Sequence, residues 1–124
     1  MSGGVLLIED DEDVATAVCD LLRDAGYTTT WVQSVAAARA AFAASRPATA
    51  IIDLVLHGER TEELVAEWAS LPDPPGMILS SVSPDAKEIA ERHRIPFVAR
   101  PFDIDAFEAA VARVSKLRLS TNSR

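Results

Sequence analysis

Two short apolar segments of this chain each end in carboxylates, and this arrangement constrains the fold more than any other feature. Residues 5–8 are followed by the acidic stretch 9–11, and residues 48–52 are followed by Asp53. Short unbroken apolar segments are typical of strands buried on both faces of a parallel sheet. Ligands of such sheets bind at the carboxyl ends of the strands, so we expect the two groups of carboxylates to meet there. Carboxylates that lie close together repel one another, and a bound divalent cation relieves this repulsion.

Strand-like segments alternate along the chain with segments whose apolar residues have helical spacing. Strands are expected over residues 5–9, 27–32, 48–53, 77–80 and 97–99, and helices over about 14–25, 34–45, 64–71, 83–93 and 104–114. Ser34, Ser83 and Asp103 are the expected N-caps. The alternation predicts an α/β fold, a doubly wound five-stranded parallel sheet with alternating helices. One domain is expected over residues 1–118, followed by a polar tail over 119–124 that is expected to be disordered.

The composition argues against several classes of function. The formal net charge of −7 argues against direct binding of nucleic acid, because phosphate contacts need clustered Lys and Arg. No apolar stretch is long enough to cross a membrane and no signal-peptide pattern opens the sequence, so a cytoplasmic location without membrane association is expected. Cys19 is the only cysteine, and its place in an apolar helical stripe indicates a core residue.

At five positions the chain resembles the receiver domains of two-component response regulators, and the resemblance extends from about residue 5 to 117. In that family an acidic pair ends the first strand, an aspartate the third and a hydroxyl residue the fourth, and Lys-Pro follows the fifth. Here the acidic pair is Glu9 and Asp10, the aspartate is Asp53, the hydroxyl residue is Ser80, and Arg100 stands in the lysine position. No single one of these motifs is specific for the family, but their occurrence in this order at the strand ends is a strong signal. The resemblance implies the flavodoxin-like order of strands.

The resemblance also implies a chemistry for these positions. Asp53 would be the phosphoacceptor and Mg²⁺ the cofactor, held directly by Asp10 and Asp53, through water by Glu9, and by the backbone carbonyl of Val55. Further positions are expected to bind the phosphoryl group or to switch with it: Ser80, Ser81, Arg100 and Phe97. A cis peptide bond is expected between Arg100 and Pro101. In the resting state, a charge-assisted pair is expected between Arg100 and Asp53.

The function implied is that of a switch in a two-component phosphorelay. A sensor histidine kinase or a phosphotransfer protein would donate the phosphoryl group, and phosphorylation would change binding to a downstream protein that the sequence does not name. The chain would catalyse only its own phosphorylation and dephosphorylation. It departs from the family at Arg100, at residues 57–58, where Pro-Gly is common, and at residues 60–61, where Asp-Gly is common.

Two other functions remain open from the sequence. A pseudo-receiver would use the same fold as an interaction module that needs no phosphorylation, and the exchange of lysine for Arg100 keeps this alternative open. A haloacid-dehalogenase-like phosphatase would place its nucleophile in an Asp-x-Asp motif after the first strand. The stretch 11–13 has that spelling but lies one residue too far into the helix start, where acidic residues favour the helix dipole without any catalytic role. Ser83 is a second candidate for the hydroxyl position.

Overall fold

A five-stranded parallel sheet forms the centre of the molecule and confirms the predicted fold class. The computed structural model describes residues 4–100 and 104–122. The strands of this sheet are β1 (Gly4–Ile8), β2 (Thr28–Val32), β3 (Thr49–Ile52), β6 (Gly76–Ser81) and β7 (Phe97–Ala99). They lie side by side in the order β2-β1-β3-β6-β7, and every neighbouring pair is parallel. The order reverses between β1 and β3, so their carboxyl ends flank the crevice where ligands of doubly wound sheets bind.

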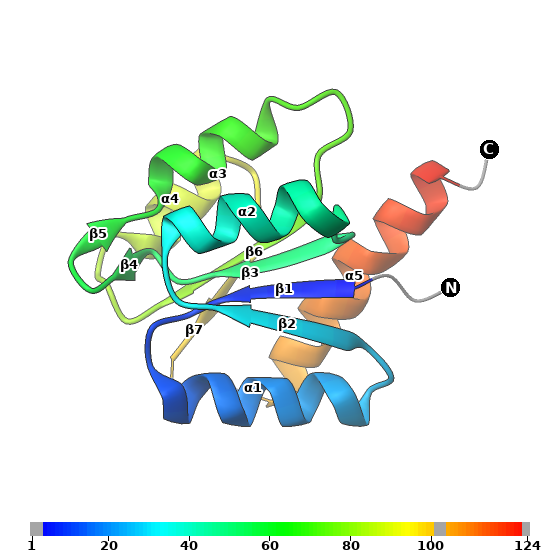
Figure 1. Cartoon of the computed structure of the whole chain (residues 1–124), viewed down its shortest axis with the longest axis horizontal. Coiled ribbons are helices and arrows are strands. Elements are labelled where there is room, and N and C mark those ends of the chain that lie inside the picture. The colour runs from blue at the N-terminus through cyan, green and yellow to red at the C-terminus, as the bar shows by residue number, and fades with distance from the viewer. Residues whose placement is uncertain (1–3, 101–103, 123–124) are drawn as a thin grey trace.

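Helices cover both faces of the sheet (Figure 1). One face packs against α1 (Glu12–Asp24) and α5 (Ile104–Asn122), and the other against α2 (Val35–Ser45), α3 (Glu62–Ala69) and α4 (Ala86–Arg92). Helix α5 continues through residues 119–122, which the sequence analysis assigned to a polar tail. Within the described part of the chain, each helix is too short or too polar to span a bilayer.

The buried strands explain the unbroken apolar segments of the sequence. In β1, Leu6 and Ile8 pack with the side chains of α2, α3 and α4, whereas Val5 and Leu7 pack with those of α1 and α5. Alternate residues of a strand point to opposite faces, so a strand covered on both sides needs apolar residues at every position. Cys19 is partly buried against the α1 and α5 side of the core.

Two of the three expected N-caps lie in the described part of the chain, and one of them is wrong. Ser34 caps α2, since its hydroxyl oxygen accepts a hydrogen bond from the amide of Ala37 at 3.1 Å. Ser83 does not cap α4, which begins later, at Ala86, with Asp85 in the cap position. The side chain of Ser81 accepts the amide N–H of Ser83 at 3.1 Å, and a turn then separates Ser83 from the helix. Asp103 lies outside the described residues.

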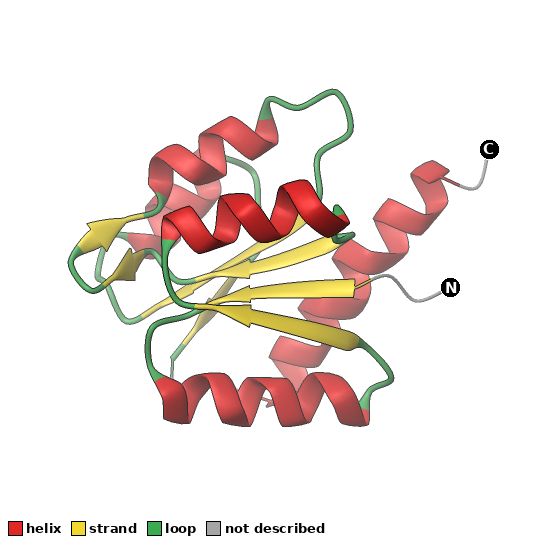
Figure 2. Ribbon diagram, viewed as in Figure 1, coloured by secondary structure: helices red, strands yellow, loops and turns green. Residues whose placement is uncertain are grey.

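A small antiparallel hairpin follows Asp53, where the sequence analysis expected only a loop. It consists of β4 (Val55–Leu56) and β5 (Glu59–Arg60), and Figure 2 shows it beyond the carboxyl ends of the main sheet. His57 and Gly58 form its two-residue turn with φ angles of 47° and 84°. Positive φ at both central positions is typical of a type I′ hairpin turn, which usually has Asn or Asp before the glycine. Because His57 stands where Asn or Asp is usual, the sequence analysis did not predict the hairpin. The glycine at position 58 was the one residue that indicated a turn of this type.

Candidate functional site

Neighbouring strands bring the predicted carboxylates together. Glu9 follows β1 and Asp53 follows β3, and the pairing of these strands continues as the amide of Asp53 donates to the carbonyl of Ile8 at 3.0 Å. One carboxylate oxygen from each of Glu9, Asp10 and Asp53 lies within 4.8 Å of the others. Glu9 is fully buried and Asp53 is 7% exposed. The cluster expected at the crevice is therefore present, and its oxygen atoms are of the type that hard cations such as Mg²⁺ prefer.

Arg100 contacts this cluster directly. Its Nη1 donates to Oδ2 of Asp53 at 3.4 Å, its Nη2 donates to Oε1 of Glu9, and its Nε donates to the hydroxyl of Ser80 at 3.4 Å. The side chain is only 13% exposed. The expected pair with Asp53 is present, but the pair with Glu9 was not predicted. A single guanidinium thus connects residues at the ends of β1, β3 and β6.

Glu9 occupies the least favourable position for a charge. Burial raises the pKa of its carboxyl group above the ordinary value, and the nearby Asp53 acts in the same direction. The amide of Asp11, which donates to Oε2 at 3.0 Å, and the guanidinium of Arg100 oppose this shift without cancelling it. The indole of Trp31 donates to the backbone carbonyl of Glu9 at 2.7 Å and fixes the main chain at this point.

Asp10 is in a more favourable environment than the sequence indicated. Burial disfavours its charge, but the backbone amide of His57 donates to Oδ2 at 2.8 Å, and the net effect lowers the pKa of Asp10. The turn of the β4–β5 hairpin therefore supports the ionised form of this carboxylate. The sequence analysis expected repulsion among the clustered carboxylates without distinguishing them, whereas in the structure the pKa of Glu9 is raised and that of Asp10 is lowered.

The backbone directly after Asp53 is held by Thr61, a residue that the sequence analysis missed. Thr61 is fully buried, and its hydroxyl lies 2.8 Å from the carbonyl oxygen of Asp53 and 3.2 Å from that of Leu54. Its amide also donates to the carbonyl of Leu54 at 2.9 Å. The amide of Val55 donates to Oδ1 of Asp53 at 3.3 Å. A threonine eight positions after the aspartate carries no signal by itself, because its contact depends on the hairpin between them.

Replacing Thr61 should reveal this support. Thr61→Val keeps the shape of the side chain but leaves the carbonyl of Asp53 without its hydroxyl donor, so the free energy of unfolding should fall by about 1–3 kcal/mol. Urea denaturation followed by circular dichroism measures the change. Thr61→Ser should recover most of the loss. Equal stability of Thr61→Val and the wild type would show that the hydroxyl contributes nothing at this position.

The other predicted site residues lie around the same edge of the sheet. Ser80 is buried at the end of β6 and contacts Arg100, whereas the hydroxyl of Ser81 accepts the amide of Ser83. Phe97 begins β7 opposite Leu79 and packs partly buried against the core cluster on the α4 side. Pro101 lies outside the described residues, so the cis peptide bond stays a prediction.

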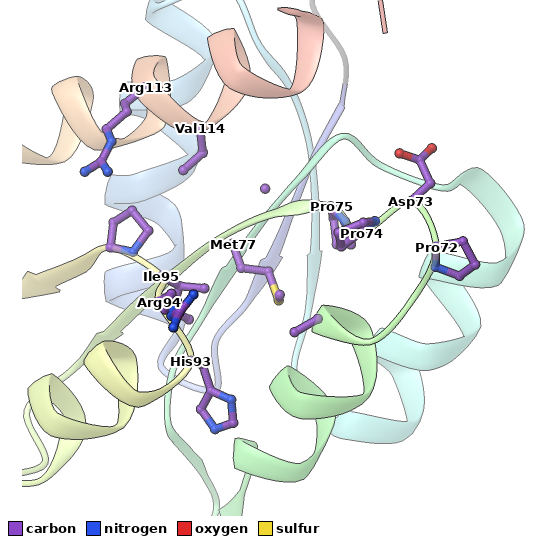
Figure 3. A pocket seen from close by; sticks show the side chains of 13 residues that line it. Pro72, Asp73, Pro74, Pro75, Met77, His93, Arg94, Ile95, Arg113 and Val114 are labelled. Carbon is purple, nitrogen blue, oxygen red and sulfur yellow. The ribbon is translucent and has the colours of Figure 1, made fainter. Parts of the chain in front are cut away.

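A cavity of about 410 Å³ lies away from these residues, at the amino ends of the strands. Its lining includes the proline-rich loop before β6, the segment between α4 and β7, and Arg113 and Val114 of α5 (Figure 3). None of the carboxylates of the cluster lines it. The binding site expected from the sequence therefore lies at the acidic cluster and not in this cavity.

Comparison with known proteins supports the same fold. No family model matches the sequence. The sequence is 26% identical to the nitrogen assimilation regulatory protein NtrX of Azorhizobium caulinodans, over 100% of this chain and 29% of that protein. The chain thus spans less than a third of the length of this relative.

Two solved structures of receiver domains are similar over nearly their whole length. The signal receiver domain of a putative LuxO repressor protein from Vibrio parahaemolyticus has a TM-score of 0.87 at 22% identity, with 98% of this chain and 96% of that chain covered. The CheY-like response regulator receiver domain from Methylobacillus flagellatus has a TM-score of 0.80 at 21% identity, with 92% and 99% covered. The chain therefore has the fold of response regulator receiver domains, as its sequence motifs implied.

Proposed function

We propose that this chain is the phosphoacceptor receiver domain of a two-component phosphorelay and that Asp53 receives the phosphoryl group. The observation that carries the proposal is the position of the Asp53 carboxylate, at the ligand-binding edge of a receiver fold with Glu9, Asp10 and Arg100 around it. Neither a fold nor a carboxylate cluster implies this function alone. Their combination, with a guanidinium and a hydroxyl aimed at the same place, suits transfer of a charged phosphoryl group.

The chemistry requires a weak nucleophile to be aligned and its charge to be offset. A carboxylate oxygen of Asp53 attacks phosphorus, the bond from phosphorus to the donor atom breaks, and the donor leaves with that electron pair as an acyl phosphate forms. The donor would be a phosphohistidine of a sensor histidine kinase or a phosphotransfer protein. The amide of Val55 orients the carboxylate of Asp53 by its contact with Oδ1.

Mg²⁺ fits the donor set of this site. Glu9, Asp10 and Asp53 offer hard carboxylate oxygens close enough to share one ion, and the backbone carbonyl of Val55 would complete the set. When bound, the ion would supply positive charge to the phosphoryl oxygens. Asp10 is the carboxylate best prepared for this role, since its pKa is lowered by the contact with the amide of His57 and it carries its charge at neutral pH.

The residues facing Asp53 from β6 and β7 would bind and sense the phosphoryl group. Ser80 and Arg100 already contact one another beside Asp53, so both can turn toward a phosphoryl oxygen. Ser81 and Phe97 would transmit the change to the surface. Arg60 in β5 pairs with Asp85 before α4 at 2.9 Å and connects the hairpin after Asp53 to that helix. A cytoplasmic downstream protein would bind the altered face, without direct contact to nucleic acid or membrane.

The test is phosphorylation by a small-molecule donor. The chain incubated with acetyl phosphate and Mg²⁺ should gain the mass of one phosphoryl group, and peptide mapping should place it on Asp53. Beryllofluoride with Mg²⁺ should shift the amide resonances around residues 53–61 and 80–82 in the nuclear magnetic resonance spectrum. A protein that acetyl phosphate, phosphoramidate and beryllofluoride all leave unchanged would instead be an interaction module that does not use phosphorylation.

A further inference from the structure

Arg100 differs from a simple partner of Asp53 in that its three nitrogen positions reach three separate residues. Nη2 contacts Glu9 after β1, Nη1 contacts Asp53 after β3, and Nε contacts Ser80 in β6. A lysine ammonium is a single point of charge and does not span these partners together, whereas the planar fork of arginine does. The carboxylates of Glu9 and Asp53 are thus already neutralised in part by the protein itself.

The same two carboxylates belong to the group of three that could hold a cation. Oε2 of Glu9 already accepts the amide of Asp11, and Oδ1 of Asp53 already accepts the amide of Val55. The remaining oxygen of each residue, Oε1 of Glu9 and Oδ2 of Asp53, is the one that faces Arg100. A divalent ion held by this group would therefore lie beside oxygens that the guanidinium already contacts, and the two positive charges would repel one another.

We propose that Arg100 is a resident counter-ion that competes with the divalent cation, so that the cation binds only when the guanidinium leaves Glu9 and Asp53. This inference rests on the proposed function, in that it takes Mg²⁺ as the ion. Because of this competition, the Mg²⁺ affinity of the chain is lower than it would be if the three carboxylates had no guanidinium beside them. Because such coupling is reciprocal, binding of the ion would also displace the side chain of Arg100 from Glu9 and Asp53.

Arg100 lies between β7 and α5, so displacement of its side chain would affect the end of β7. The residue follows β7 directly, and α5 begins four positions later, at Ile104. Release of its side chain from Glu9 frees the end of β7 from its link to β1 and β3. Binding of the cation would therefore change the outer edge of the sheet before any phosphoryl group arrives.

The experiment compares Mg²⁺ affinity in wild type, Arg100→Lys and Arg100→Ala by isothermal titration calorimetry. The intrinsic fluorescence of Trp31, whose indole donates to the carbonyl of Glu9, gives a second readout at the same site. Arg92→Ala is the matched control, because it removes the same charge from α4, where Arg92 pairs with Glu62 and Glu88 away from the cluster. If Arg100→Ala is too unstable to titrate, Arg100→Lys still carries the test.

Arg100→Ala should bind Mg²⁺ about 5- to 150-fold more tightly than wild type, the usual range for coupled sites. Arg100→Lys should fall between the two, and Arg92→Ala should match the wild type. Equal or weaker Mg²⁺ binding in both Arg100 variants would overturn the competition while leaving the phosphoacceptor proposal intact. Absence of Mg²⁺ binding in every protein would overturn both the competition and the metal site. An equal gain in Arg92→Ala would show that net charge alone caused the effect and would also overturn the inference.

Discussion

Asp53→Asn is expected to gain no phosphoryl group from acetyl phosphate under conditions that modify the wild type completely. The amide of asparagine lacks the charged oxygen that attacks phosphorus, so the loss should be total and not a matter of rate. The fold should persist, since an asparagine oxygen still accepts the amide of Val55 and its shape matches that of aspartate. Intact mass spectrometry measures the adduct, and hydroxylamine should remove it from the wild type because it is an acyl phosphate.

Asp11→Asn is the matched control for this substitution. It removes the same charge close to the site, but Asp11 acts as the N-cap of α1, where its carboxylate accepts the amides of Asp13 and Val14 at 2.9 and 3.2 Å. Asparagine is an equally good N-cap, so this variant should fold and be modified like the wild type. Modification of Asp53→Asn to the same extent as Asp11→Asn would mean that another carboxylate is the acceptor.

The sequence predicts the sheet and the carboxylate cluster well because both depend on strong local signals. Strands buried on two faces must be apolar at every position, and residues at the ends of adjacent parallel strands must lie close together. The proximity of Glu9 and Asp53 thus follows from the sequence pattern alone. The start of α4 was less predictable, because Ser83-Pro84 has the composition of a helix start but forms a turn ahead of it.

The remaining features of the site depend on contacts between segments that are distant in the sequence. Thr61 reaches the carbonyl of Asp53 only because the β4–β5 hairpin folds back between them. The amide of His57 reaches Asp10 across 47 positions in the sequence, and its contact depends on a backbone with positive φ. Composition and spacing did not indicate these two hydrogen bonds, because each depends on the folded path of the β4–β5 hairpin. The contact between Arg100 and Glu9 was likewise not predicted, and 91 positions separate these two residues.

Arg100→Ala is expected to lower the free energy of unfolding in the absence of metal by about 3–5 kcal/mol at pH 8, because it leaves the buried charge of Glu9 without its partner. Glu9 is 1% exposed in its side chain, so its carboxylate has almost no contact with solvent in the wild-type protein. A loss of this size is a large part of the stability of an ordinary domain. Urea denaturation in the presence of EDTA measures it.

The loss should depend on pH with a definite sign. The folded pKa of Glu9 lies above its ordinary value of 4.5, mainly because of burial, so between these two values the native state binds more protons than the unfolded state. Stability therefore falls as the pH rises from about 4.5 through the folded pKa of Glu9. Arg100 normally lowers that pKa, so its removal should deepen the fall and extend it to higher pH. The difference between Arg100→Ala and wild type should accordingly shrink as the pH is lowered toward 4.5.

A second substitution separates the buried charge from lost packing. The double variant Glu9→Gln/Arg100→Ala removes both charges, and most of the stability lost in Arg100→Ala at pH 8 should return, with a flatter dependence on pH. If the loss came only from missing contacts of the arginine side chain, the double variant would be no more stable than Arg100→Ala. A loss below about 1 kcal/mol that is equal at pH 5 and pH 8 would contradict the pairing itself, since exposed ion pairs contribute that little. The guanidinium would then lie outside the cluster in solution, and the three carboxylates would have to be stabilised by water or a cation alone.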